Sequence, residues 1–177
     1  MTAPDFRFDK DSHTYWLGVA RLPSVTQILD AVGLISPYGK RQDAAVRGTL
    51  VHLASQYIFE DRLDRAQLDD QLKGYATSLD LWIQGSGFKA RHCEVSGYHK
   101  ELLYAGSWDV DGMLPPHGEW LIDLKSGVPS AWHKYQTAAY KGILGRPVHR
   151  GALYLQKSGK PAKFRLHDDP QDWPKFV

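Results

Sequence analysis

An acidic pair and a lysine occur in two neighbouring stretches whose patterns predict paired strands. Polar and apolar residues alternate over residues 106–113 and 119–125, as they do in half-buried β-strands. Side chains two apart in a strand lie on the same face, so Asp123 and Lys125 are expected to lie together. Asp109 on the preceding strand could join them. Two carboxylates and an amine at one place could hold a divalent cation and act on a phosphodiester.

The chemistry behind this interpretation is specific to these residue types. A hard cation such as Mg²⁺ prefers oxygen ligands and takes one or two carboxylates. Phosphodiester cleavage also needs an activated water and stabilisation of charge on the phosphorus oxygens, which Lys125 could supply. The simpler alternative is an ion pair on an exposed sheet face. Asp123 follows the apolar Leu121-Ile122, however, and a carboxylate at the end of a core strand is costly unless it is paired or metal-bound.

The partner strand offers two carboxylates. Alternation predicts that Asp109 and Asp111 share one face, opposite Trp108 and Val110. The turn between the strands is expected at residues 115–118, which read Pro-Pro-His-Gly.

Other candidate side chains are scattered along the chain. His52 lies on a predicted helix, where a lone histidine is more often a surface or core residue than a ligand. Glu94 could face the same site from the preceding strand, with Glu101 as its competitor. Cys93 is the one cysteine, which excludes an internal disulfide and a Cys-rich zinc or iron–sulfur site. It is expected to be a small buried residue and not a nucleophile.

Length and composition indicate a single domain over residues 1–177. A hydrophobic fraction of 42% and a charged fraction of 24% are ordinary for a globular protein. A net charge of +2 leaves the partner undecided, because binding depends on where the charge lies. No apolar run approaches a membrane span, and no leader is visible at the N-terminus, so we expect a cytoplasmic protein that does not bind a membrane.

Periodicity and turn signals predict a mixed α/β (α+β) fold, with a central sheet flanked by helices. Ser24 and Gln27 form a capping-box pattern at one helix start, and Ser130 is expected to cap another. The expected elements are an N-terminal β-hairpin over 6–22, helices over 25–31, 40–61 and 65–84, strands over 89–98, 102–114 and 119–124, a helix over 131–144, a hairpin over 150–167 and a short terminal helix.

The helix expected over residues 40–61 carries two features of interest. Val46, Leu50 and Leu53 continue an apolar stripe at spacings of three and four, with His52 at its edge. Gly48 lies inside the same helix at a cost of about 1 kcal/mol relative to alanine, so a close approach is expected there.

Four short motifs occur in a recognisable order. They are Gly48-x-x-x-His52, Gly106-x-x-Asp109, Asp123-x-Lys125 and Gln136-x-x-x-Tyr140. Together they resemble the PD-(D/E)XK nuclease superfamily, in particular its RecB-like exonuclease branch. The segment Leu22-Pro23-Ser24-Val25-Thr26 is similar to phage-type members, and the resemblance extends from about residue 13 to residue 156.

The resemblance implies a restriction-endonuclease-like fold and a site for Mg²⁺ or Mn²⁺. The ligands it implies are the side chains of His52, Asp109 and Asp123 and the carbonyl of Leu124. It further implies that Lys125 activates or positions the attacking water, that Gln136 and Tyr140 brace the site and contact the DNA backbone, and that Glu94 is a nearby acidic group that could serve a second metal. The single cysteine excludes the iron–sulfur cluster of some relatives.

DNA is the implied partner, as single strands or duplex ends. Association with a second copy of the chain, or with a recombination or helicase protein, is left open. Candidate phosphate contacts are Arg41, Arg47, Lys134 and Lys141. Trp132 and Tyr135 could stack an unpaired base, although packing is the commoner use of such aromatic residues.

The sequence thus predicts a metal-dependent deoxyribonuclease, most simply an exonuclease, in recombination, repair or phage DNA processing. One alternative is a catalytically silent DNA-binding or assembly protein on the same fold. Another is a hydrolase that uses Asp109 with Asp111 or Glu94 as an acid–base pair, which leaves the roles of His52 and Lys125 unexplained.

Overall fold

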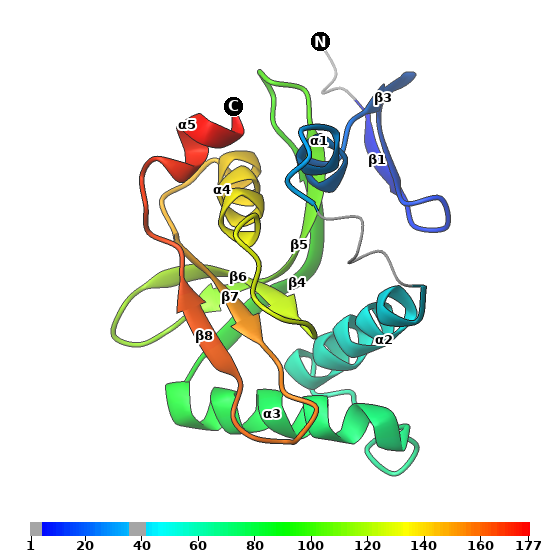
Figure 1. The fold of residues 1–177 in the computed structure, drawn as a ribbon, viewed down its shortest axis with the longest axis vertical. Coiled ribbons are helices and arrows are strands. Elements are labelled where there is room, and N and C mark those ends of the chain that lie inside the picture. The colour runs from blue at the N-terminus through cyan, green and yellow to red at the C-terminus, as the bar shows by residue number, and fades with distance from the viewer. Residues whose placement is uncertain (1–4, 36–41) are drawn as a thin grey trace.

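The computed structural model describes residues 5–35 and 42–177, and it confirms the mixed α/β class (Figure 1). A large sheet has the order β4-β5-β6-β7-β8, and a small sheet has the order β1-β2-β3. The strands are β1 (Phe6–Asp9), β2 (Thr14–Leu17), β3 (Ala20–Leu22), β4 (Lys89–Tyr98), β5 (Ala105–Met113), β6 (Glu119–Lys125), β7 (His149–Tyr154) and β8 (Lys163–Leu166). The helices are α1 (Val25–Ala31), α2 (Gln42–Phe59), α3 (Asp70–Ser86), α4 (His133–Leu144) and α5 (Asp172–Phe176).

The large sheet is mixed because α4 forms a crossover between β6 and β7. These two strands are parallel, and the other neighbouring pairs are antiparallel. One face packs on α2 and α3 through a cluster that includes Leu79, Val110 and Ile122. The opposite face packs on α1 and α4 through a cluster that includes Leu29 and Leu121. The central sheet is therefore covered by helices on both faces, as the sequence predicts.

The small sheet is a three-stranded extension of the predicted N-terminal hairpin. Tyr15 and Leu22 pack with Ala105 of β5 in a third cluster. The Tyr15 hydroxyl lies 2.9 Å from the Ser107 hydroxyl, which lies 2.6 Å from the hydroxyl of Ser96. The small sheet is thus fixed to β4 and β5 by one face.

Several predicted boundaries need correction. The strand expected from residue 102 begins at Ala105, because Leu103 has a positive φ of 52° in the turn before it. The helix expected from residue 65 begins at Asp70, with Asp69 as its N-cap. Ser130 does not cap α4 through its side chain. Trp132 is the N-cap without a side-chain hydrogen bond, and the Ser130 N–H donates to His133 Nδ1.

The predicted apolar stripe of α2 is also wrong in its orientation. Val46, Leu50 and Leu53 are between 43% and 55% exposed, whereas Val51 and Ala54 are buried. The helix is rotated so that its small and β-branched residues meet the sheet. Within the described parts of the chain, no helix is both long and apolar enough to cross a membrane.

Candidate metal-dependent active site

A backbone irregularity in β4 and β5 shapes the site. Glu94 has a positive φ of 51°, and the residues on either side of it, Cys93 and Val95, pack against opposite core clusters. In β5, Trp108 and Val110 likewise pack against opposite clusters. The regular alternation predicted for residues 106–113 therefore breaks in the middle of β5.

The break separates the two carboxylates of β5, so the prediction that Asp109 and Asp111 share a face is wrong. Asp111 is fully buried and accepts a hydrogen bond of 3.0 Å from Trp108 Nε1. It also lies 3.2 Å from Arg146 and 3.1 Å from His92. Asp111 therefore belongs to a structural network separate from the contacts of Asp109 with His52 and Leu124.

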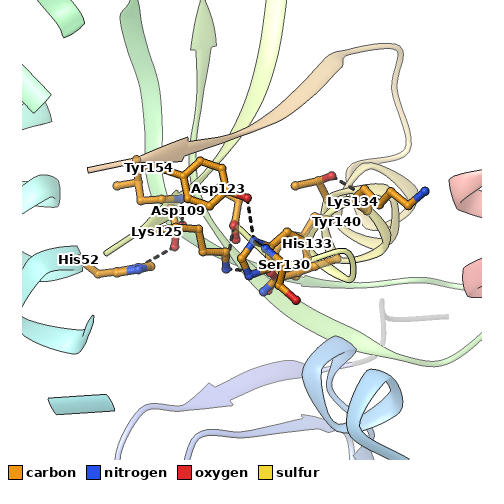
Figure 2. A network of polar contacts seen from close by, with 12 residues as sticks. His52, Asp109, Asp123, Lys125, Ser130, His133, Lys134, Tyr140 and Tyr154 are labelled. Carbon is orange, nitrogen blue, oxygen red and sulfur yellow. Dashed lines mark hydrogen bonds and ion pairs between the residues drawn. The ribbon is translucent and has the colours of Figure 1, made fainter. Parts of the chain in front are cut away.

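Asp109 lies between α2 and β6, as Figure 2 shows. Its Oδ1 is 2.9 Å from Nδ1 of His52, and its Oδ2 accepts a short hydrogen bond from the backbone N–H of Leu124. Glu94 Oε1 is 4.0 Å from His52 Nδ1. One ligand atom from each of His52, Glu94 and Asp109 lies within 4.8 Å of the others. Glu94, and not Glu101, is thus the acidic residue at this place.

Asp123 and Lys125 are paired on β6, as the strand pattern predicts. Lys125 Nζ is 2.8 Å from Asp123 Oδ2 and donates a 2.8 Å hydrogen bond to Gln136 Oε1. Gln136 Nε2 then donates to the Tyr140 hydroxyl at 2.8 Å. A continuous polar chain therefore extends from the end of β6 into α4 (Figure 2).

Gly106 explains how Tyr140 reaches this position. A Cβ at residue 106 would lie 2.7 Å from Tyr140 Cε1 and 3.1 Å from Val25 Cγ2. The Tyr140 ring therefore lies directly against the backbone at Gly106. At Gly48 the described residues make no such close approach, since a Cβ there would meet Ser126 Oγ at an ordinary 3.9 Å.

Burial and crowding perturb the acidic groups of the site. Burial raises the pKa of Asp123 to about 6, against the opposing effect of Lys125. Burial, with the neighbouring Asp109, raises the pKa of Glu94 to about 7. Burial would also raise the pKa of Asp109, but the facing His52 holds it below its usual value. In turn, and against the effect of burial, Asp109 raises the pKa of His52 to about 9.

These properties fit a bound divalent cation. Asp123 Oδ2 is buried and lies 2.8 Å from Lys125 Nζ, with no hydrogen bond from any other described residue. Carboxylates held so close together are stabilised by added positive charge. The donor set of imidazole nitrogen and carboxylate oxygen suits Mn²⁺, and the carboxylates also suit Mg²⁺. The residues present therefore fit the predicted ion, with Glu94 as a further candidate ligand.

The basic residues predicted to contact DNA phosphates lie in different surroundings. Arg47 Nε is buried without a hydrogen-bond partner among the described residues. Lys134 pairs with Asp172 at 3.3 Å, and Lys141 lines a cavity of about 610 Å³ at the far end of α4. Arg41 lies outside the described residues. The DNA contacts of these residues stay predictions.

The aromatic candidates and the cysteine have internal roles. Trp132 is half-buried and lies 5.3 Å from Lys125 Nζ, so its ring helps to hold the lysine. Tyr135 is similarly covered by Lys134 at 5.0 Å. Burial raises the pKa of Cys93 to about 12, which fits the expectation that it is not a nucleophile.

One pair beside the site was not identified from the sequence. His133 Nδ1 lies 2.8 Å from the hydroxyl of Tyr154, whose strand pairs with β6 at Lys125. Burial, with Lys125 next in effect, lowers the pKa of His133 to about 3. His133 precedes Gln136 by three residues, and this helical spacing places both on one side of α4. That spacing could have identified it.

Comparison with models of known protein families gives no match for this chain. Comparison with curated proteins gives no significant match either.

Proposed function

We propose that this protein is a Mg²⁺- or Mn²⁺-dependent deoxyribonuclease, acting as an exonuclease on DNA ends or single strands. The observation that carries the proposal is the convergence of His52, Glu94 and Asp109 beside the Asp123–Lys125 pair. These residues come from α2 and from three strands, so the site is assembled by the fold and not by one local motif. A cytoplasmic location in a bacterial or phage-infected cell is part of the proposal.

The ion would be held by His52, Asp109, Asp123 and the Leu124 carbonyl, with Glu94 close enough to join them. A divalent cation bound here would neutralise phosphate charge and acidify a water molecule. Both carboxylate oxygens of Asp109 are held in place, because Oδ1 contacts His52 and Oδ2 accepts a hydrogen bond from the Leu124 N–H. Asp109 could therefore act as a ligand without reorienting.

Lys125 is held in place by its neighbours. Its ammonium forms an ion pair with Asp123, donates a hydrogen bond to Gln136 and lies over the Trp132 ring. A preorganised ammonium can stabilise negative charge that develops on a phosphate without reorienting. Gln136 fixes the position of Lys125 while its own amide is fixed by Tyr140. Gln136 and Tyr140 are therefore positioning residues in this proposal.

The two alternative functions, an acid–base hydrolase and a catalytically silent binding protein, fit the site geometry to different degrees. The acid–base hydrolase would use Asp111 or Glu94 beside Asp109, and Asp111 is buried against Trp108 and Arg146. Glu94 stays near Asp109, yet that pair alone gives no role to Lys125. A catalytically silent binding protein has the same fold, so only metal binding and turnover separate it from the nuclease.

The test of turnover uses end-labelled single-stranded DNA, duplex DNA and a closed circle, each with Mg²⁺ or Mn²⁺. Asp123→Asn and Lys125→Met should each abolish cleavage of the linear DNA, while circular dichroism shows a folded protein. Asp168→Asn and Lys160→Met change the same residue types at exposed positions and should cleave normally. Undiminished cleavage by both site variants would refute the proposal.

Metal binding provides a second measurement that needs no turnover. A cation that binds the folded state alone stabilises it by about 2.7 kcal/mol at a concentration of 100 times the Kd. Mn²⁺ should therefore raise the Tm of the wild-type protein, and Glu94→Gln or Asp109→Asn should reduce that rise. A Tm that does not respond to either ion would favour the silent alternative.

A further inference from the structure

The outer face of the small sheet carries an unusual row of side chains. Arg7, Trp16 and Arg21 are cross-strand neighbours, since Trp16 is paired with Arg7 in β1 and with Arg21 in β3. Both arginines are exposed and Trp16 is half-buried. The Arg7 guanidinium lies 5.5 Å from the centre of the Trp16 ring. A cation and an aromatic face thus already form the first layer of a stack.

The fold does not need this row for its core. The inner face of the same sheet supplies Tyr15 and Leu22, with Phe6 and Phe8 packed against them. Trp16 belongs to none of the core clusters of the described residues. A large indole on the outward face of a small sheet therefore has no packing role in the interior.

Among the described residues neither arginine is held in an ion pair within 4.0 Å, although Arg7 is near enough to Asp9 on the same strand to help lower the pKa of that carboxyl. Most other arginines there do make an ion pair; these are Arg62, Arg65, Arg91, Arg146 and Arg150. Two unpaired guanidinium groups on either side of an aromatic ring give a positive surface with a stacking site at its centre.

We propose that the row formed by Arg7, Trp16 and Arg21 binds single-stranded DNA. Guanidinium groups hydrogen-bond phosphate oxygens in a bidentate manner, and an unpaired base can extend the Arg7–Trp16 stack. A duplex keeps its bases paired and stacked, so it could use the arginines but not the ring. The inference rests on the proposed function, and it names the strand form that the protein recognises.

The small sheet connects this row to the group formed by His52, Glu94 and Asp109. Lys10 lies in the turn between β1 and β2, and its ammonium is near enough to Glu94 to oppose the rise that burial causes in the pKa of that carboxyl. Tyr15 in β2 is tied to Ser107 in β5. Figure 1 shows the small sheet beside α1, with the β1–β2 turn directed towards the side of α2. A strand held on the row could therefore continue past this turn towards Asp109.

Binding is tested without cleavage, by fluorescence anisotropy of labelled oligo-dT and of a duplex in EDTA. The Arg7→Gln/Arg21→Gln variant should bind both DNAs more weakly, and its slope of log affinity against log salt on oligo-dT should be smaller by about 1.4 for two lost phosphate contacts. Trp16→Val should weaken oligo-dT binding about 5- to 150-fold and leave duplex binding unchanged. Trp16→Phe keeps an aromatic ring and should retain most of the affinity.

The control removes two other exposed cations, as Lys157→Gln/Lys160→Gln in the turn between β7 and β8, and should leave both the affinity and the salt slope unchanged. Wild-type affinity in the Arg7/Arg21 variant, or an equal loss of oligo-dT and duplex binding in Trp16→Val, would overturn the inference even if the protein cleaves DNA. Conversely, row-dependent binding of oligo-dT by a protein that never cleaves DNA would refute the nuclease and leave the row established.

Discussion

Replacing Gly106 with alanine tests whether the Tyr140 ring is held against β5. The new Cβ would lie 2.7 Å from Tyr140 Cε1, whereas ordinary contacts begin at 3.4 Å. Tyr140 is only 5% exposed and its hydroxyl is bonded to Gln136, so the ring cannot swing into solvent. It must withdraw by about 0.7 Å within a packed cluster.

The expected magnitude follows from the cost of overpacking. Inserting a methyl group into a well-packed core costs about 1–3 kcal/mol. For a domain of this size each kcal/mol lowers Tm by about 2–4 °C, so Gly106→Ala should lower Tm by about 2–12 °C. If the protein is a nuclease, the displaced Tyr140 should also disturb Gln136 and Lys125. A misplacement near 1 Å can reduce activity by about a hundredfold.

The assay is a double-mutant cycle of thermal and urea denaturation. Gly106→Ala is measured in the wild-type protein and in Tyr140→Leu, which removes the ring that the Cβ meets. The loss caused by Gly106→Ala should be smaller by at least about 0.5 kcal/mol in the Tyr140→Leu background, because contacting residues are coupled. Gly85→Ala is the matched control, because it is exposed on α3 and a Cβ there meets nothing within 4 Å.

The stability result is independent of the nuclease proposal. An equal loss in both backgrounds would show that the Tyr140 ring is not the obstacle, and the close contact at Gly106 would then be wrong. A Gly106→Ala protein as stable as the wild type would refute the packing argument directly. Gly85→Ala should be neutral or stabilising by up to about 1 kcal/mol, as expected for Gly to Ala in a helix.

Three further outcomes follow from the structure. Asp172→Ala should lower stability by about 3–5 kcal/mol in denaturation experiments, because it leaves the buried Arg150 unpaired. Burial lowers the pKa of His167 to about 4, so the unfolded chain binds a proton that the folded protein does not. Stability should therefore fall as the pH drops from about 6.5 to 4, by up to about 1.4 kcal/mol per pH unit for this group, and His167→Asn should reduce that slope in urea titrations at several pH values. Gly48→Ala should raise Tm, because among the described residues a Cβ there finds only an ordinary contact with Ser126, and the change removes a glycine from a helix.

Helix ends could be predicted from the sequence where residues next to the end cap it. The capping box of Ser24 and Gln27 is present at α1 as expected. Gly87 ends α3 in the left-handed conformation, and Gly145 does the same at α4. In each case a side chain or a glycine within one turn satisfies the helix end, so no distant contact was needed to infer it.

Elements whose orientation depends on distant contacts could not be predicted in the same way. The apolar residues Val46, Leu50 and Leu53 have the spacing of a buried stripe, yet α2 packs through Val51 and Ala54. The smaller face lets the helix approach the sheet and brings His52 to Asp109. Hydrophobic spacing alone cannot show that a requirement for close approach selects the less apolar face.

The centre of the hairpin shows why spacing also misjudged the two carboxylates. Regular alternation would put Asp109 and Asp111 on one face, but the left-handed Glu94 opposite Asp109 reverses the pleat at that point. A non-glycine residue costs about 1–2 kcal/mol in that conformation, and such strain persists where surrounding contacts impose it. As a result, Glu94 and Asp109 lie beside His52, whereas Asp111 forms an ion pair with Arg146. Glu94→Gly should therefore retain the bend without strain but lose the carboxylate. We expect this variant to be more stable than the wild type and to show a smaller Mn²⁺-induced rise in Tm. The two results together would separate the backbone role of Glu94 from its role as a ligand.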